Sequence, residues 1–242
     1  MTDDVRIGSR GAHVLEIVLA RPDAGNALTP AMADAIVGAF DAMPADTRAI
    51  LLRAEGADFC TGRTPVMPQP GTRATALDLR RLIADPVLDF YQRLRDLPVP
   101  LVMVVQGRAF GVGCALAGLA DVCIAADTAT FSIPEMDKDI APTLVMTALS
   151  DRLSRTDLAR LVLTRAPVSA SEAKLIGLVG SVCQGENLLD EADSILAKLR
   201  TNSVPVLSAV KTFLNQHAEM SFAARREAAA LMNCVVTAER YR

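Results

Sequence analysis

Short apolar runs alternate with stretches of helical periodicity through the first half of the chain. Thr29 and Pro30 form an N-cap residue followed by a first-turn proline, and the apolar positions after them recur at helical spacing. This pattern predicts a helix lying between two strands. Runs rich in Val, Ile, Leu and Ala, which are typical of buried strands, occupy residues 13–20, 49–53, 101–105 and 122–125.

The second half of the chain becomes mainly helical after residue 134. Before it, leucines over 76–97 recur at roughly helical intervals and predict one helix there. Ser169 and Glu172 have the spacing of a capping box, which predicts a short helix before a strand over 178–183. Strands and helices followed by helices alone predict an α/β core with an appended helical layer. Three further helices are predicted over 188–199, 204–217 and 222–236.

Charge and composition narrow the class of ligand. The 242 residues include 25 Lys and Arg against 28 Asp and Glu, so the chain lacks the basic excess of proteins that bind nucleic acid or anionic membranes. Residues 109–126 are apolar enough to suggest a membrane span, but their glycines and Asp121 favour a buried element of a soluble protein. We therefore expect a small-molecule ligand, with no nucleic-acid or membrane partner.

The cysteines and the N-terminus indicate the compartment. The 5 cysteines show no CxxC spacing and only 2 histidines accompany them, so we expect reduced thiols and no metal site. The first ten residues carry acids and no apolar segment, so we expect no secretory signal and a cytoplasmic protein. An already removed targeting peptide remains an alternative.

Two glycine-containing turns carry the candidate chemistry. One turn, 59–63, contains Gly62, and the other contains Gly111 and Gly113 ahead of a stretch of small residues that predicts a helix. Such a helix would direct unpaired backbone N–H groups at whatever lies before the turn. Amides from both turns would then hold one carbonyl oxygen. The alternative is that the glycines only let a strand and a helix pack closely.

Five motifs follow one another along the chain: RPDAGNALTPAM (21–32), GADFCTGRT (56–64), VQGRAFGVGCAL (105–116), FSIPEMDKDIAP (131–142) and SASEAKLIGLV (169–179). In this order they resemble the motifs of the crotonase family, also called the enoyl-CoA hydratase and isomerase superfamily. The resemblance implies a crotonase-like spiral of ββα units over 1–185 and a helical C-terminal trimerisation region over 186–242, together one functional unit. It also implies a homotrimer or homohexamer, and an acyl-CoA thioester as ligand, with coenzyme A as part of the substrate and no separate cofactor.

The resemblance also assigns the binding residues. The two oxyanion amides fall on Arg63 and Val112, where only the backbone N–H matters, and they would stabilise an enolate of the thioester. Gly62 and Gly111, which precede them, are implied to contact the substrate. Backbone contacts with coenzyme A are implied for Asn26 and Ala27.

One glutamate of the usual pair is missing. Hydratases of this family use two glutamates, which here fall on Glu135 and on Ala115, and alanine cannot carry a proton. A single glutamate resembles the Δ3,Δ2-enoyl-CoA isomerases of the family, which shift a double bond with one proton carrier. The resemblance implies that Ala115 contributes to the apolar substrate-binding pocket, and a pocket containing Ala115 would raise the pKa of such a base. Asp137 and Asp139 are alternative proton carriers.

The missing glutamate leaves other functions open. One is hydration, hydrolysis or decarboxylation in which another group or a bound water replaces the glutamate. Another is a non-catalytic acyl-CoA-binding subunit. Tyr91, in the helix predicted over 76–97, is interpreted as a core residue, with the acyl pocket as its alternative. The segment 64–97 is the least family-like and is expected to shape acyl-group specificity.

Overall fold

The computed structural model describes residues 3–64, 66, 68, 71, 73–238 and 241. Its centre is a six-stranded sheet in the order β1-β2-β3-β4-β6-β9, in which β1 pairs with β2 antiparallel and all other pairs are parallel. Part of the proline-rich loop predicted from residue 64 to 71 lies outside the described residues. The strands are β1 (Val5–Ser9), β2 (Val14–Leu19), β3 (Ala49–Ala54), β4 (Leu101–Val105), β6 (Val122–Ala126) and β9 (Ser181–Cys183).

The four apolar runs of the sequence are confirmed as β2, β3, β4 and β6, and β4 is buried along its whole length. β1 is an additional strand that the pattern does not predict, because only Val5 of its five residues is buried. β9 is shorter than the predicted strand over 178–183. Leu178 and Val179 instead donate their N–H groups to the Ala173 carbonyl at the end of the preceding helix.

A second, three-stranded sheet consists of β5 (Arg108–Phe110), β7 (Thr130–Ser132) and β8 (Val168–Ser169), in the order β5-β7-β8. Strands of two or three residues are too short to show periodicity, so the sequence does not predict them. β5 directly follows β4 and directly precedes a helix, so this small sheet sets the position of the glycine turn between them.

Helix α1 (Pro30–Asp41) begins as predicted, since Thr29 Oγ1 accepts a hydrogen bond from Met32 N at 3.1 Å.

The single helix predicted over 76–97 is instead three segments: α2 (Ala76–Leu79), a π-helical turn (Arg80–Ala84) and α3 (Asp85–Arg95). Pro86 has no N–H to donate to the turn before it, which explains a break in the regular hydrogen bonding at this point.

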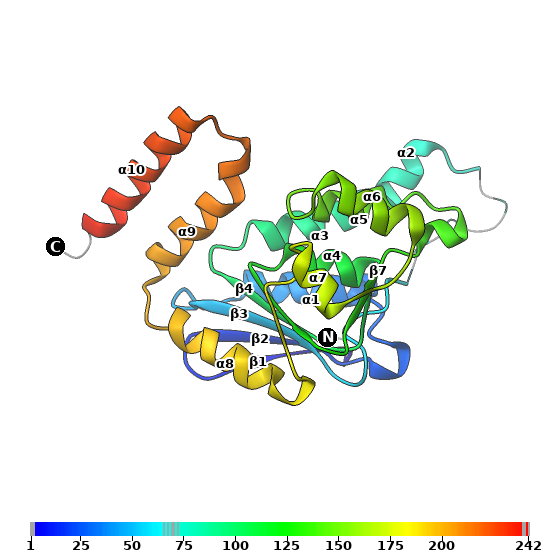
Figure 1. Cartoon of the computed structure of the whole chain (residues 1–242), viewed down its shortest axis with the longest axis horizontal. Helices are drawn as coiled ribbons and strands as arrows, with labels where there is room; N and C mark the ends of the chain where they lie inside the picture. Colours follow the sequence, from blue (N-terminus) through cyan, green and yellow to red (C-terminus); the bar gives the residue numbers. More distant parts are fainter. Residues whose placement is uncertain are drawn as a thin grey trace.

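Helices cover both faces of the sheet (Figure 1). α1, α3 and α4 (Val112–Leu119) lie on one face, and α8 (Leu188–Leu199) packs on the other, against β4 and β6. Every residue of α4 is buried. Arg152 donates hydrogen bonds to the Gly118 and Ala120 carbonyls at the end of this helix. α5 (Thr143–Leu149) packs beside α4, and α6 (Arg155–Thr164) and α7 (Ala170–Leu175) complete this layer.

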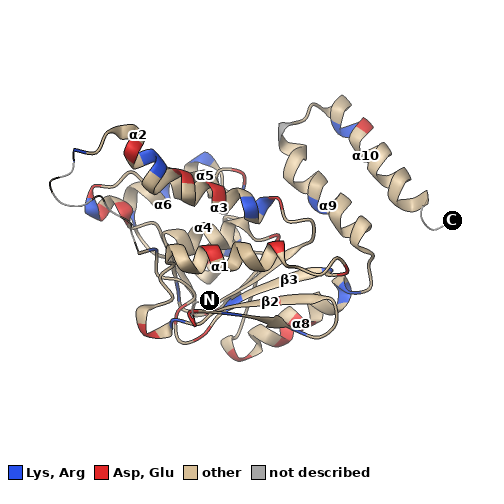
Figure 2. Cartoon of the chain, turned by 180° about the vertical axis from the view of Figure 1, so that it is seen from behind, with Lys and Arg blue, Asp and Glu red and all other residues tan. Residues whose placement is uncertain are grey.

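The two last helices, α9 (Val204–Gln216) and α10 (Phe222–Ala238), form a hairpin that projects from the body (Figures 1 and 2). No described residue of α10 is buried. α9 is anchored by Lys211, which is 3% exposed and whose Nζ lies 2.6 Å from Asp121 Oδ2. The same carboxylate oxygen accepts a hydrogen bond from Leu101 N at 2.7 Å. Among the described residues, no helix combines the length and the apolarity that a membrane crossing requires.

Candidate active site

The glycine turn between β5 and α4 needs glycine at two positions. Gly111 has φ 53°, a left-handed conformation, and donates its N–H to the Ser132 carbonyl at 2.9 Å. A Cβ atom on Gly113 would overlap the Cys60 carbonyl oxygen of the other turn. The glycines therefore allow α4 to begin in direct contact with the turn over 59–63.

Backbone hydrogen bonds hold the two turns side by side. Cys60 donates its N–H to the Arg108 carbonyl at 3.1 Å, and its own carbonyl accepts from Phe110 N at 2.9 Å. Leu28 N donates to the Gly62 carbonyl at 2.9 Å, which attaches the first turn to the segment before α1. The two turns, separated by about 50 residues in the sequence, are thus adjacent in the fold, as the sequence predicts.

Two backbone N–H groups at these turns are free to bind a ligand. Val112 is the first residue of α4, where helical N–H groups lack intrahelical acceptors, and Arg63 ends the other turn. In the described part of the chain, neither N–H donates a hydrogen bond to a protein acceptor. Both residues line the same small cavity, so the structure brings the two predicted oxyanion residues together.

This cavity, which we call the Glu135 cavity, has a volume of about 70 Å³. Its described lining contains one carboxylate, one phenol, one guanidinium and otherwise apolar side chains. A second cavity of about 70 Å³ adjoins it, shares Arg63, Val87 and Val112 with it, and extends towards the start of α1 and the π-helical turn. The Glu135 cavity is lined by Arg63, Val87, Tyr91, Val112, Glu135, Ile140, Ala141, Pro142, Leu144 and Val145.

Glu135 begins the 3₁₀ turn Glu135–Lys138, directly after Pro134 and three residues after the end of β7. Its Oε1 lies 2.5 Å from where a Cβ atom on Gly111 would be, so the carboxylate faces the glycine turn. Its Oε2 is buried and has no hydrogen-bond partner among the described residues. Burial raises the pKa of Glu135, opposed by its own backbone N–H and by the charge of Arg63.

The alternative acids face elsewhere. Asp137 Oδ1 lies 3.1 Å from Arg165 Nε, in an ion pair that is partly exposed. Asp139 is exposed and adopts φ 54° at the end of the 3₁₀ turn. Neither residue lines the Glu135 cavity, so Glu135 is the better candidate for proton transfer.

Tyr91 is both a core residue and a residue that lines the cavity, the two interpretations that the sequence leaves open. It is 3% exposed and packs in α3 beside Phe90, yet it also lines the Glu135 cavity. Its hydroxyl is buried without a hydrogen-bond partner in the described structure. A single tyrosine on an apolar helix face carries a polar tip that packing alone does not require, and this is the signal by which the sequence could have singled it out.

Asn26, predicted to lie in the coenzyme A-side loop, is fully buried and uses its side chain inside the protein. Its Oδ1 accepts from Arg21 N at 2.8 Å, and its Nδ2 donates to the Glu55 and Asp58 carbonyls, each at 2.8 Å. Asn26 therefore fixes the shape of the loop that contains Ala27. Neither residue lines the two cavities described above, and their contact with coenzyme A stays a prediction.

Ala115 is fully buried at the end of the first turn of α4 and does not line the Glu135 cavity. Its methyl group leaves Glu135 as the single carboxylate among the described lining residues. Cys60 is also buried nearby, and burial raises the pKa of its thiol to about 11, so it is protonated at neutral pH and a poor nucleophile. In the described part of the chain, no three His, Cys, Asp or Glu residues cluster closely enough to hold a metal ion.

Comparison with known proteins identifies the family of the chain. The sequence model of the family described as enoyl-CoA hydratase/isomerase matches residues 9–240. The chain is 30% identical over 220 residues to 2,3-dehydroadipyl-CoA hydratase of Escherichia coli, covering 90% of this chain and 84% of that protein. It is 31% identical over 213 residues to a mitochondrial enoyl-CoA hydratase of Pongo abelii, covering 86% and 70% respectively.

Solved structures share the fold. The crystal structure of an enoyl-CoA hydratase from Mycobacterium smegmatis superimposes with a TM-score of 0.88, covering 97% of this chain and 91% of that one at 24% identity. Human enoyl-coenzyme A hydratase domain-containing protein 3 gives a TM-score of 0.86 over 96% and 90% of the two chains, also at 24% identity. The predicted crotonase-like fold is confirmed, and the chain belongs to the enoyl-CoA hydratase/isomerase family.

Proposed function

We propose that this protein is a Δ3,Δ2-enoyl-CoA isomerase that moves one proton with Glu135. The Glu135 carboxylate removes a proton from C2 of a 3-enoyl thioester, and the electron pair moves into the thioester carbonyl. The Arg63 and Val112 N–H groups donate hydrogen bonds to the resulting enolate oxygen. Glu135 then returns the proton to C4, the double bond moves to C2–C3, and no atoms are gained or lost.

The observation that carries this proposal is that, among the described residues lining the cavity of the two free amides, Glu135 supplies the one carboxylate. Isomerisation needs one group that accepts and returns a proton, whereas hydration by two carboxylates needs a second acid at the Ala115 position. The apolar lining raises the pKa of Glu135, which favours a group that exchanges protons near neutral pH.

The proposal is tested by incubating the protein with 3-enoyl-CoA and 2-enoyl-CoA thioesters of several chain lengths. Conversion of the 3-enoyl thioesters without change of mass, followed by chromatography and mass spectrometry, is the expected result. Glu135→Gln should lower that rate about 100-fold or more, because a general base of this kind contributes at least that much. Asp137→Asn removes a neighbouring acid that lies outside the cavity and should leave the rate within about twofold. A Glu135→Gln enzyme of wild-type activity contradicts the proposal.

Hydration is a second candidate function, and the Tyr91 hydroxyl is the observation that favours it. Tyr91 lines the same cavity as Glu135, and its hydroxyl has no hydrogen-bond partner among the described residues, so it is available to hold a water molecule in place of the missing glutamate. The relatives named above are called hydratases. Addition of water to 2-enoyl-CoA, seen as an increase in mass, would assign this activity. Tight binding without turnover of any thioester would instead indicate a non-catalytic acyl-CoA-binding subunit.

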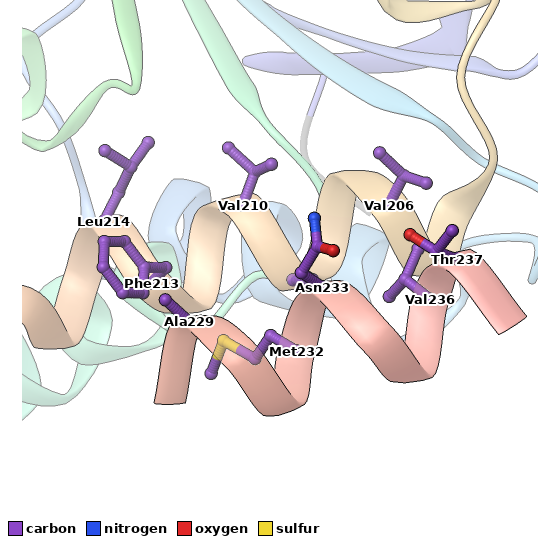
Figure 3. Close-up of a pocket in the computed structure, with 10 residues that line it drawn as sticks. Val206, Val210, Phe213, Leu214, Ala229, Met232, Asn233, Val236 and Thr237 are labelled. Carbon is purple, nitrogen blue, oxygen red and sulfur yellow. The ribbon is translucent and has the colours of Figure 1, made fainter. Parts of the chain in front are cut away.

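We further propose that the protein assembles into homotrimers or homohexamers through its C-terminal hairpin. α9 and α10 enclose a groove of about 400 Å³ lined mainly by Val, Leu, Phe, Met and Ala side chains (Figure 3). Val210 is 54% exposed and Leu231 is 67% exposed, which is unusual for helices of a globular monomer. The charged residues of α10 gather near its start (Figure 2), and the uncharged remainder suits an apolar contact with another copy.

A further inference from the structure

Two residues that line one cavity each carry a buried polar atom without a hydrogen-bond partner in the described structure. In the described structure, four buried side-chain polar atoms lack a partner, and two of these, the Tyr91 hydroxyl and Glu135 Oε2, belong to residues lining the Glu135 cavity. Buried polar groups in folded proteins are almost always hydrogen-bonded, so an unpaired set at one cavity needs an explanation. A ligand atom placed between them would supply the missing partner.

The size and lining of the cavity restrict the size and polarity of the ligand group that fits there. A volume of about 70 Å³ has room for roughly two water-sized groups, each occupying about 30 Å³ in the liquid. The other lining residues beyond Arg63 are apolar: Val87, Val112, Ile140, Ala141, Pro142, Leu144 and Val145. One oxygen atom on a small hydrocarbon group matches this combination of a polar pair and an apolar wall.

The two protein groups have complementary hydrogen-bonding roles. Burial raises the pKa of Tyr91, so its hydroxyl stays protonated at neutral pH and donates a hydrogen bond. The Glu135 carboxylate, when ionised, only accepts. An atom that bonds to both must accept one hydrogen bond and donate one. A hydroxyl group and a water molecule do this, whereas a carbonyl oxygen cannot donate.

Packing in the core restrains the Tyr91 ring. α3 buries Phe90, Tyr91 and Leu94, and the Phe90 and Tyr91 ring centroids are 6.5 Å apart. A buried ring held on a helix loses little freedom when it makes one more hydrogen bond. Tyr91 therefore offers a preformed donor, which is what selects one ligand over another that lacks the acceptor.

We propose that Tyr91 is a specificity-determining residue that donates a hydrogen bond to a hydroxyl or water oxygen at C3 of the bound acyl group. This inference rests on the proposed function, in which Glu135 faces C2. An oxygen that donates its own hydrogen to Glu135 Oε2 then lies beside the next carbon, C3. The two sources of such an oxygen are the hydroxyl of a 3-hydroxyacyl thioester and a water molecule held beside an enoyl thioester.

Calorimetric titration with 3-hydroxybutyryl-CoA and butyryl-CoA separates this role from general binding. The wild-type protein should prefer the 3-hydroxy thioester by about tenfold, the effect of one good hydrogen bond. Tyr91→Phe, which removes only the hydroxyl, should reduce the preference to about one while leaving butyryl-CoA affinity within about twofold. If the preference survives unchanged in Tyr91→Phe, or is absent from the wild type, Tyr91 does not bind the hydroxyl of a 3-hydroxyacyl thioester.

Enzyme kinetics tests whether the oxygen bound by Tyr91 belongs to a water molecule. If Tyr91 holds a water molecule, Tyr91→Phe should slow hydration of crotonyl-CoA by about tenfold more than it slows isomerisation of a 3-enoyl thioester. Loss of either the binding preference or the hydration rate supports the role of Tyr91, and loss of neither overturns it. Failure of the wild type to bind butyryl-CoA at all would refute the proposed function itself, and this inference with it.

Discussion

Two opposing effects, burial and a nearby positive charge, set the pKa of Glu135. Burial raises the pKa of its carboxyl above the ordinary value of 4.5, while the positive charge of Arg63 acts in the opposite direction. Glu135 must be ionised to remove a proton, so kcat/KM for the 3-enoyl thioester should rise with pH through a midpoint above 4.5. The free enzyme's essential base is read from this profile.

Arg63→Gln tests this balance because it removes the charge and keeps the backbone N–H. The midpoint of the pH profile should move to higher pH, since the charge that lowers the pKa of Glu135 is gone while burial remains. Lys138→Gln provides a matched control, because Lys138 acts in the same direction with a smaller effect. A midpoint that falls in Arg63→Gln would show that the guanidinium does not act on Glu135.

The raised pKa of Glu135 also affects the stability of the folded protein. A carboxyl whose pKa is raised by folding binds its proton more tightly in the folded state, so stability is lost as pH rises from the unfolded pKa through the folded one. Glu135→Gln, which stays neutral, should therefore melt at a higher temperature than the wild type at pH 7.5, with a smaller difference at pH 4. Calorimetric melting at both pH values measures this, and a lower Tm for the variant at pH 7.5 contradicts it.

The sequence predicts the roles of some individual residues but not of others. Glu135 follows from its place in a family motif, because nothing in its neighbourhood of charged residues distinguishes it as a base. The unpaired Tyr91 hydroxyl depends on the relative placement of α3 and the 3₁₀ turn, which no local pattern encodes. The buried hydrogen bonds of the Asn26 side chain likewise join two loops about 30 residues apart.

At the scale of elements, α4 and α1 each contain a glycine whose surroundings differ. A Cβ atom on Gly113 in α4 would overlap the Cys60 carbonyl, whereas Gly38 in α1 has open space beside it. Gly113→Ala should destabilise the protein by about 1–3 kcal/mol through overpacking and lower activity by displacing the start of α4. Gly38→Ala should stabilise it by about 0.5–1 kcal/mol through helix propensity. Urea unfolding of both variants, with kcat/KM for Gly113→Ala, measures the contrast, and equal effects would refute it.

Long apolar elements are predictable and short polar ones are not. The parallel strands β2, β3, β4 and β6 are buried and therefore read as continuous apolar runs. β5, β7 and β8 owe their existence to backbone pairing between distant segments, which leaves no local signal. Leucine spacing continues through the π-helical turn, so the pattern over 76–97 does not predict the break in the helix there.

At the scale of the whole molecule, the C-terminal hairpin is the element that a single copy leaves exposed. If copies of the chain cover it, the protein should sediment as a trimer or hexamer, and Val210→Glu should dissociate it by placing a charge in the apolar groove. Leu175→Glu, at an exposed leucine of α7 outside that groove, serves as the control and should keep the assembly. A wild-type protein that sediments as a monomer at micromolar concentration contradicts the proposal.

The overall architecture was within reach of the sequence, but the arrangement of its last helices was not. Helical periodicity gives the positions of α8, α9 and α10 without saying what each one packs against. α8 covers the sheet, whereas α9 and α10 extend away from it (Figure 1). The division into 1–185 and 186–242 stays a prediction.

The Lys211–Asp121 contact determines how the hairpin responds to its solvent environment. Lys211 is 3% exposed, so dissolved ions reach this pair far less than they reach ion pairs at the surface. The root of the hairpin should consequently stay attached in concentrated sodium chloride. Sulfate, which strengthens apolar burial, should even favour association of copies through this arm.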